Sequence, residues 1–124
     1  MVESGRPLIL VVEDEPLQLI ATCDVAEDAG YEPLMASDAE TAWSMIEHRR
    51  DIDVVLSDVD LPGSDGLSLV KAIHECWPSV SLILVSGHHR PDPSQLPEGT
   101  LFLAKPFNPV ALTATLIKMR LDRP

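Results

Sequence analysis

Residues 53–66 read DVVLSDVDLPGSDG. The strand predicted over Val54–Ser57 is mostly apolar, and Asp58 follows it just before a Pro-Gly turn. In an open parallel α/β sheet, ligands bind in the crevice at the carboxyl ends of the strands. The segment therefore predicts a buried strand that carries the Asp58 carboxylate at that edge of a sheet, where the side chain is available for chemistry.

The rest of the chain alternates between strand and helix patterns, which is typical of a parallel sheet with crossover helices. The apolar run Leu8–Val12 predicts the first strand, and further strands are expected at 32–36, 80–85 and 101–104. These elements predict one α/β domain over residues 1–124, with a core of about 7–121. Apolar residues at helical spacing predict helices from Pro16 to Gly30, behind Ser37, from Gly66 to Trp77 and from Pro109 to Leu121.

Two segments give more local expectations. Ser37 and Glu40 have the spacing of a capping box, in which Ser37 caps the following helix and Glu40 reaches back to it. Three prolines lie within residues 91–97, between the predicted fourth and fifth strands. Because proline lacks a backbone donor and disrupts helix interiors, we expect at most a single turn around Pro93–Leu96.

The chain of 124 residues has 9 basic and 20 acidic side chains and a formal net charge of −11. This charge opposes nucleic-acid binding, because phosphate contacts need clustered Lys and Arg. No apolar run reaches the length of a membrane span, and the first residues lack the apolar core of a signal peptide, so we expect a cytoplasmic protein without membrane contact. Cys23 and Cys76 lie in separate predicted helices and are expected to be buried free thiols.

Four predicted strands are followed by polar residues whose chemistries complement one another: Glu13 and Asp14, Asp58, Ser86, and Lys105. In a doubly wound sheet these strand ends meet at one edge. Crowded carboxylates repel one another and raise at least one carboxyl pKa, and a hard cation such as Mg²⁺ relieves this repulsion. The lysine adds a positive charge and the serine a hydroxyl donor. The set predicts phosphoryl transfer with Asp58 as nucleophile and an aspartyl phosphate as the product of attack.

At these positions the chain closely resembles the receiver domain of two-component response regulators, including the chemotaxis-regulator type. The resemblance covers essentially all 124 residues and implies a flavodoxin-like, doubly wound, five-stranded parallel sheet in the order 2-1-3-4-5. The proline-rich segment departs from the family pattern, so the fourth helix is expected to be short or replaced by a loop. Four motifs carry the resemblance: Glu13-Asp14, Asp58-x-x-Leu61-Pro62-x-x-x-Gly66, Ser86-Gly87 and Lys105-Pro106-Phe107.

The resemblance implies a phosphoacceptor and a metal site. Asp58 would accept the phosphoryl group from the phosphohistidine of a histidine kinase. Mg²⁺, or Mn²⁺ in its place, would bind directly to the carboxylates of Asp14 and Asp58 and to the backbone carbonyl of Asp60. Glu13 would contact the metal through water. The protein would thus be a phosphorylated switch and not a metabolic enzyme, although it would catalyse its own phosphorylation and dephosphorylation.

The same resemblance implies the residues that bind and report the phosphoryl group. Lys105 would pair with a phosphoryl oxygen, and Pro106 matches the cis-peptide position of the family. Ser86 and Phe102 would be the switch residues, whose side chains move on phosphorylation. The partners implied are a histidine kinase or phosphotransfer protein and a downstream protein target, and the family pattern leaves room for a weak homodimer.

Two alternatives come from other classes. Asp58-Val59-Asp60 also fits the Asp-x-Asp of a Mg²⁺-dependent haloacid-dehalogenase-like phosphatase, but there the motif closes the first strand of the core. A phosphorylation-independent pseudo-receiver would lack an acceptor, a metal ligand or the lysine, and none is missing here. Simpler interpretations also exist: Glu13-Asp14 as a helix cap, and His88-His89 as an exposed loop pair.

Overall fold

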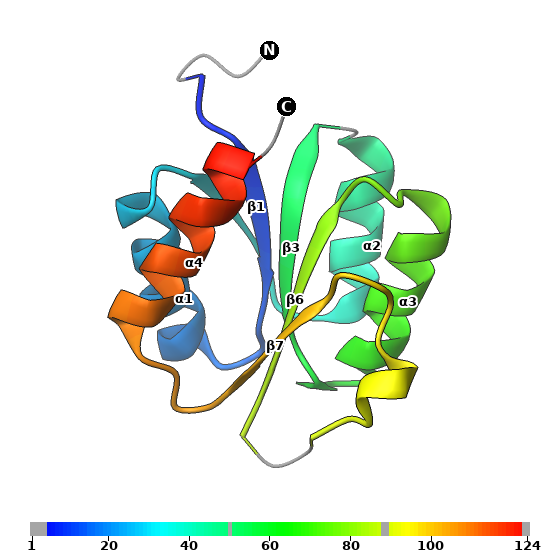
Figure 1. The fold of residues 1–124 in the computed structure, drawn as a ribbon. Helices are drawn as coiled ribbons and strands as arrows, with labels where there is room; N and C mark the ends of the chain where they lie inside the picture. Colours follow the sequence, from blue (N-terminus) through cyan, green and yellow to red (C-terminus); the bar gives the residue numbers. More distant parts are fainter. Residues whose placement is uncertain (1–4, 50, 88–89, 123–124) are drawn as a thin grey trace.

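The computed structural model describes residues 5–49, 51–87 and 90–122. Five strands form one parallel sheet in the order second, first, third, sixth and seventh strand (Figure 1). This arrangement confirms the predicted 2-1-3-4-5 order, because two short strands outside the sheet shift the numbering. The sheet strands are β1 (Leu8–Val12), β2 (Glu32–Ala36), β3 (Ile52–Asp58), β6 (Ser81–Ser86) and β7 (Leu101–Ala104).

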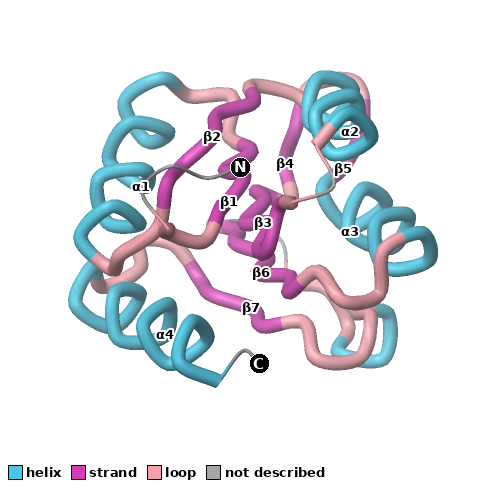
Figure 2. Tube along the Cα trace, turned by 90° about the horizontal axis from the view of Figure 1, so that it is seen from above, coloured by secondary structure: helices cyan, strands magenta, loops and turns pink. Residues whose placement is uncertain are grey.

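Helices cover both faces of this sheet, giving three layers. On one face lie α1 (Pro16–Asp28) and α4 (Pro109–Asp122), and on the other lie α2 (Ala39–His48) and α3 (Gly66–Cys76) (Figures 1 and 2). None of the helices in the described part of the chain combines the length and the apolar character that a membrane span requires.

Burial on both faces explains why the central strands are apolar throughout. All five residues of β1 are buried, and successive side chains point to opposite sides of the sheet. Ile9 and Val11 pack into the core under α1 and α4, whereas Leu10 and Val12 pack into the core under α2 and α3. Strand β1 therefore forms part of both cores, and its carboxyl end is held in a fixed position.

Helix α1 begins at Pro16, behind the Glu15 N-cap, and its C-cap is Ala29. Gly30 follows with a φ of +96°, a left-handed conformation that favours glycine. The next residue, Tyr31, is fully buried, and its hydroxyl donates a hydrogen bond to the Leu116 carbonyl of α4 at 2.8 Å. The end of α1 is thus tied to α4 across the same face of the sheet.

The predicted capping box at α2 is wrong by one residue. The helix begins at Ala39, and its N-cap is Asp38, whose carboxylate accepts a hydrogen bond from the Thr41 backbone N–H at 2.7 Å. Asp and Ser are comparable N-cap residues, so the sequence Ser37-Asp38 offers two adjacent start positions. The extended backbone at Asp38 selects the second of them.

Strand β3 is followed by a two-stranded hairpin, β4 (Asp60–Leu61) with β5 (Ser64–Asp65). Gly63 lies in the turn with a φ of +73°. Helix α3 starts directly after β5, and the Gly66 N–H donates to the Val59 carbonyl at 2.8 Å. This compact connection brings the start of α3 against the end of β3.

The connection between β6 and β7 contains a three-residue 3₁₀ turn, η1 (Pro93–Gln95), in its described residues. Asp92 caps the turn by accepting a hydrogen bond from the Ser94 N–H at 3.0 Å. In place of a multi-turn fourth helix, the protein therefore has the single turn that the prolines predict.

The two cysteines differ from each other. Cys23 is buried under α1 as expected, and burial raises the pKa of its thiol to about 11. Cys76 is exposed, so the prediction of a second buried thiol is wrong. The buried stripe of α3 runs through Leu69, Val70 and Ile73, and the next position on that stripe is Trp77, one residue beyond the cysteine.

Candidate functional site

Three carboxylates meet at the carboxyl ends of β1 and β3. One oxygen each of Glu13, Asp14 and Asp58 lies within 4.8 Å of the others. The parallel register pairs Val12 with Ser57, so the residues that follow these two in the chain are brought side by side. Asp58 and Glu13 are 6% and 5% exposed, while Asp14 is open to solvent. The acidic pair after the first strand and the acid of the third strand thus form one cluster.

Lys105 joins this cluster from the end of β7. Its ammonium donates hydrogen bonds to Glu13 Oε1, Asp58 Oδ2 and Gln18 Oε1, each at 2.7 Å. An ammonium has three N–H donors, so all of them are used. The sequence-based prediction missed Gln18. Its one available signal was its place in the first turn of α1, directly behind the acidic pair.

Burial dominates the electrostatics of the site. It raises the pKa of Glu13, against the hydrogen bonds from Lys105 and from the Glu15 N–H, and repulsion by Asp58 adds a smaller contribution in the same direction. For the Lys105 ammonium, burial opposes the charged form, but the bonds to Asp58 and Glu13 outweigh it and raise the pKa. The expected rise of a carboxyl pKa is therefore found at Glu13, with burial rather than crowding as its main cause.

Backbone donors fix the orientation of both buried carboxylates. Asp58 Oδ1 accepts a hydrogen bond from the Asp60 N–H at 3.1 Å, so its two oxygens have different partners. Glu13 Oε2 accepts from the Glu15 N–H at 3.0 Å, while its other oxygen holds Lys105. The Val59 N–H donates to a carbonyl of β6, at Val85, which secures the loop after Asp58.

The remaining predicted site residues come from β6 and β7. Ser86 ends β6 and is buried, and its carbonyl accepts a hydrogen bond from the Lys105 N–H at 2.8 Å. Phe102 is half-buried against the core under α2 and α3, and the Arg90 guanidinium lies 5.3 Å from its ring centroid. The peptide bond between Lys105 and Pro106 is cis. His88 and His89 lie outside the described residues.

Two cavities adjoin at this edge of the sheet. The one that contains the carboxylates has a volume of about 270 Å³, and Asp60 and Gly87 also line it. The other, of about 580 Å³, lies between α1 and the segment before α4, with mostly apolar walls that include Ala21 and Phe107. Gln18, Gly87 and Lys105 line both cavities, so the lysine stands between the polar site and the apolar groove.

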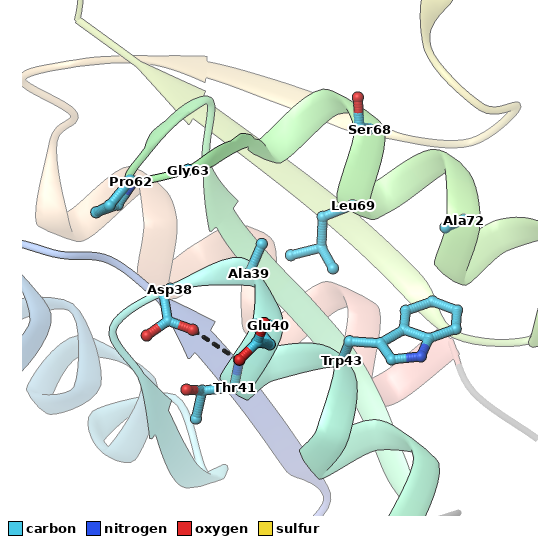
Figure 3. A pocket seen from close by; sticks show the side chains of 10 residues that line it. All are labelled: Asp38, Ala39, Glu40, Thr41, Trp43, Pro62, Gly63, Ser68, Leu69 and Ala72. Atoms are coloured by element: carbon cyan, nitrogen blue, oxygen red, sulfur yellow. Dashed lines mark hydrogen bonds between the residues drawn. The ribbon is translucent and has the colours of Figure 1, made fainter.

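A larger cavity of about 720 Å³ lies elsewhere, between the start of α2 and α3 (Figure 3). Its polar wall includes Asp38, whose carboxylate already caps α2 through Thr41, as the dashed line shows. Among the described residues that line it there is no lysine and none of the three clustered carboxylates. Cavity size therefore does not locate the chemistry of this protein, whereas the convergence of charged strand ends does.

The donor set fits a hard divalent cation. Three carboxylates can each offer one oxygen to a common point, and oxygen ligands are those that Mg²⁺ and Mn²⁺ prefer. Glu13 and Asp58 each use both carboxylate oxygens, for Lys105 and for a backbone N–H, whereas Asp14 is open to solvent and is the carboxylate most accessible to a cation.

Comparison with known sequences agrees with this geometry. Residues 9–117 match the sequence model of the response regulator receiver domain. The nitrogen assimilation regulatory protein NtrX of Azorhizobium caulinodans is 35% identical over 105 residues, which are 81% of this chain and 23% of that protein. The sensor kinase CckA of Brucella abortus is 30% identical over 122 residues, which are 94% of this chain and 13% of the kinase. The chain spans less than a quarter of the length of either relative.

Solved structures share the fold. A response regulator receiver domain protein from Clostridium thermocellum has a TM-score of 0.83 at 26% identity, with 93% of this chain and 94% of that chain covered. The chemotaxis response regulator CheY4 of Vibrio cholerae has a TM-score of 0.80 at 28% identity, with coverages of 93% and 99%. The match over residues 9–117 and the common fold show that the chain belongs to the response regulator receiver domain family.

Proposed function

We propose that this chain is a phosphoacceptor switch that receives a phosphoryl group on Asp58 from the phosphohistidine of a histidine kinase or phosphotransfer protein. One observation carries the proposal: the Asp58 carboxylate is buried at the end of the central strand, 2.7 Å from the Lys105 ammonium and beside two further acids. The family to which the chain belongs supports the same assignment. The whole of residues 1–124 acts as one receiver domain in this proposal.

In the transfer step, an Asp58 carboxylate oxygen attacks phosphorus and the bond from phosphorus to the histidine nitrogen breaks. The electron pair of that bond stays on the imidazole, which takes a proton from solvent. Lys105 balances the charge on a phosphoryl oxygen, and the Ser86 hydroxyl donates a hydrogen bond to another. Hydrolysis of the aspartyl phosphate by water restores the carboxylate, so the chain supports both halves of its own cycle.

A divalent cation completes the charge balance in this proposal. Asp14, Asp58 and the backbone carbonyl of Asp60 would bind Mg²⁺ or Mn²⁺ directly, and Glu13 would do so through water. When bound, the cation neutralises the negative charge of the acids and of the incoming phosphoryl oxygens. The indirect role of Glu13 is the one that the resemblance to receiver domains implies, and its two oxygens hold Lys105 and the Glu15 N–H.

Ser86 and Phe102 would transmit the change of state to a downstream protein. The serine directly follows Val85, the residue of β6 that pairs with Asp58, and the phenylalanine lies on the outer strand β7, which follows the proline-rich connection. Because this connection holds a 3₁₀ turn, the surface that changes is a loop surface. A partner that reads this face would contact the segment around η1 and β7.

Neither alternative class is supported. Asp58 is the last residue of β3, which is the third strand of the chain and the middle strand of the sheet. In the haloacid-dehalogenase-like phosphatases, the Asp-x-Asp motif instead follows the first strand. A pseudo-receiver would lack part of the site, but the carboxylates and the lysine are in contact. The family match is to receiver domains.

The experiment that tests the proposal measures intact mass after incubation with acetyl phosphate and Mg²⁺. We expect one phosphoryl group on the wild type, and none on Asp58→Asn or when the divalent cation is removed by a chelator. Asp92→Asn, at an exposed cap of η1, is the matched control and should be phosphorylated normally. Unchanged labelling of Asp58→Asn, or no labelling of the wild type by small donors or kinases, would overturn it.

A further inference from the structure

The cavity between α2 and α3, at about 720 Å³, has the size of a ligand-binding pocket. Trp43 of α2 and Leu69 and Ala72 of α3 give it apolar walls, and Pro62 and Gly63 from the turn between β4 and β5 also line it (Figure 3). No described residue lines both this cavity and the carboxylate cavity around Asp58. It is therefore a second hollow of the molecule, separate from the proposed site of phosphoryl transfer.

The polar part of this cavity is acidic. Asp38 and Glu40 line it, and in the described part of the chain no lysine, arginine or histidine does so. Hydrogen bonds from Thr41 lower the pKa of the Asp38 carboxyl, so this group is charged at neutral pH. Because Asp38 caps α2 and offsets the positive end of the helix dipole, Glu40 adds a net negative charge. The cavity thus favours a cationic ligand over an anionic one.

Two further acids extend this charge along the helices. Glu47 follows Trp43 by four positions on α2, and Glu75 follows Ala72 by three positions on α3. Helical spacing places each of them on the same side of its helix as the residue that lines the cavity. A cationic group that approaches along the groove between the helices therefore meets acidic side chains from both.

The Trp43 ring adds a feature that acidic side chains alone do not provide. It is half-buried, packs against Trp77 with ring centroids 5.2 Å apart, and forms part of the cavity wall. The face of an indole attracts cations, and the planar guanidinium of arginine stacks on it. The aliphatic stem of an arginine can pack against apolar walls such as those of Leu69 and Ala72.

We propose that this cavity is a docking site for a basic segment of a partner protein, whose arginine side chain stacks on Trp43 and pairs with Glu40. Glu40 precedes Trp43 by three positions, so both lie on one side of α2. The formal net charge of −11 attracts such a segment to the chain, and the cavity selects where it binds. The docking does not depend on phosphorylation of Asp58.

Intrinsic fluorescence can report the binding, because Trp43 and Trp77 are the two tryptophans of the chain and are in contact. The full chain is titrated with the acetylated and amidated peptide Leu-Arg-Ala-Leu-Arg-Ala in about 0.15 M salt, where the Debye length is about 8 Å. We expect a saturable change in fluorescence, and ¹⁵N NMR shifts at the Trp43 indole N–H and in α2 and α3. The same peptide with citrulline, a neutral analogue of arginine, should bind about tenfold more weakly.

Three variants locate the site. Glu40→Gln removes the charge beside Trp43 and should weaken binding about twofold to fivefold. Glu27→Gln, at an exposed acid of α1 on the opposite face of the sheet, changes the net charge equally and should bind like the wild type. Ser68→Arg, at an exposed position in the cavity wall, places a cation of the chain itself there and should abolish binding. Circular dichroism confirms that each variant is folded.

Several results would overturn the proposal. They are the absence of saturable binding at millimolar peptide, equal affinity for the citrulline peptide, equal weakening by Glu40→Gln and Glu27→Gln, and undiminished binding by a folded Ser68→Arg variant. If free arginine amide bound as tightly as the peptide, the ligand would be a small cation and not a protein segment. No phosphodonor enters these measurements, so their failure is distinct from a failure of Asp58 to accept a phosphoryl group.

Discussion

Gly66 sets how closely α3 approaches the end of β3. A Cβ atom placed on this residue would overlap the Asp58 carbonyl oxygen and crowd the Ser57 hydroxyl. These neighbours belong to the buried strand that ends at Asp58, so they cannot move aside without shifting that strand. The glycine is therefore required by close approach, and its backbone φ is not in the left-handed region.

We expect Gly66→Ala to lower the free energy of unfolding by about 3 kcal/mol, the upper part of the range for overpacking in a well-packed interior. The matched control is Gly87→Ala, whose added Cβ would lie 3.6 Å from Lys105 Cβ, an ordinary contact. Chemical denaturation of both variants checks this. Equal stabilities of the two variants would contradict the steric explanation.

Glu13 makes stability depend on pH, because its carboxyl pKa is raised by burial above the ordinary value of 4.5. The folded protein binds this proton more tightly than the unfolded chain does. The contribution is therefore favourable below the unfolded pKa and is lost as the pH rises through the folded pKa. At neutral pH the protein carries the cost of a buried charged carboxylate that Lys105 offsets only in part.

Glu13→Gln removes this cost. Relative to the wild type, we expect the variant to gain stability between about pH 4 and pH 7, the direction given by the raised pKa. Urea denaturation at both pH values, in the presence of a chelator, measures the difference. A stability difference that stays constant across this range, or that falls with rising pH, would contradict the assignment.

The residue at which helix α2 begins is set by its N-cap. Asp38 has an extended backbone and accepts the Thr41 N–H, and this hydrogen bond lowers the pKa of its carboxyl. In the middle of the helix, Trp43 packs against Trp77, which directly follows α3, with ring centroids 5.2 Å apart. The start of α2 is thus fixed by its cap and its position by the aromatic pair.

A substitution that removes the side chain of Asp38 should therefore destabilise the protein, whereas the same substitution at Ser37 should not. We expect Asp38→Ala to lower the midpoint of thermal unfolding more than Ser37→Ala does, because the first variant leaves the Thr41 N–H without its acceptor. Circular dichroism melts at neutral pH compare the two. The opposite order would restore the serine as the N-cap.

The fold of the whole molecule places Glu13, Asp14 and Asp58 close together at the carboxyl edge of the sheet. We therefore expect divalent cations to stabilise the folded protein. Since the cation binds the folded state, Mg²⁺ at a hundred times its dissociation constant should raise the free energy of unfolding by about 2.7 kcal/mol. Asp14→Asn should remove most of this gain, and Asp92→Asn, at the cap of η1 and not a member of the cluster, should keep it. Denaturation with Mg²⁺ and with a chelator measures both. An equal gain in Asp14→Asn would place the cation elsewhere.

Much of this architecture follows from local patterns. Runs such as Leu8–Val12 are apolar because both faces of a central parallel strand are buried, and this leaves a clear mark in the sequence. Acids that directly follow such runs must lie at the carboxyl edge of the sheet, because strands in parallel end on the same side. The convergence of Glu13, Asp14 and Asp58 could therefore be predicted from these patterns, whereas the order of the strands was predicted from the family resemblance.

Other features depend on distances between segments that are remote in the chain. The hydrogen bond from Lys105 to Gln18 joins β7 to α1, and no local pattern marks either partner for the other. The exposure of Cys76 and the choice of Asp38 as cap depend on where a helix face or a helix start falls, to within one residue. The periodic pattern of apolar residues determines where the strands lie and at which edge of the sheet the acidic residues after them are found. The packing of helices against the sheet decides which side chains touch, because a shift of a helix by one residue changes all of its contacts.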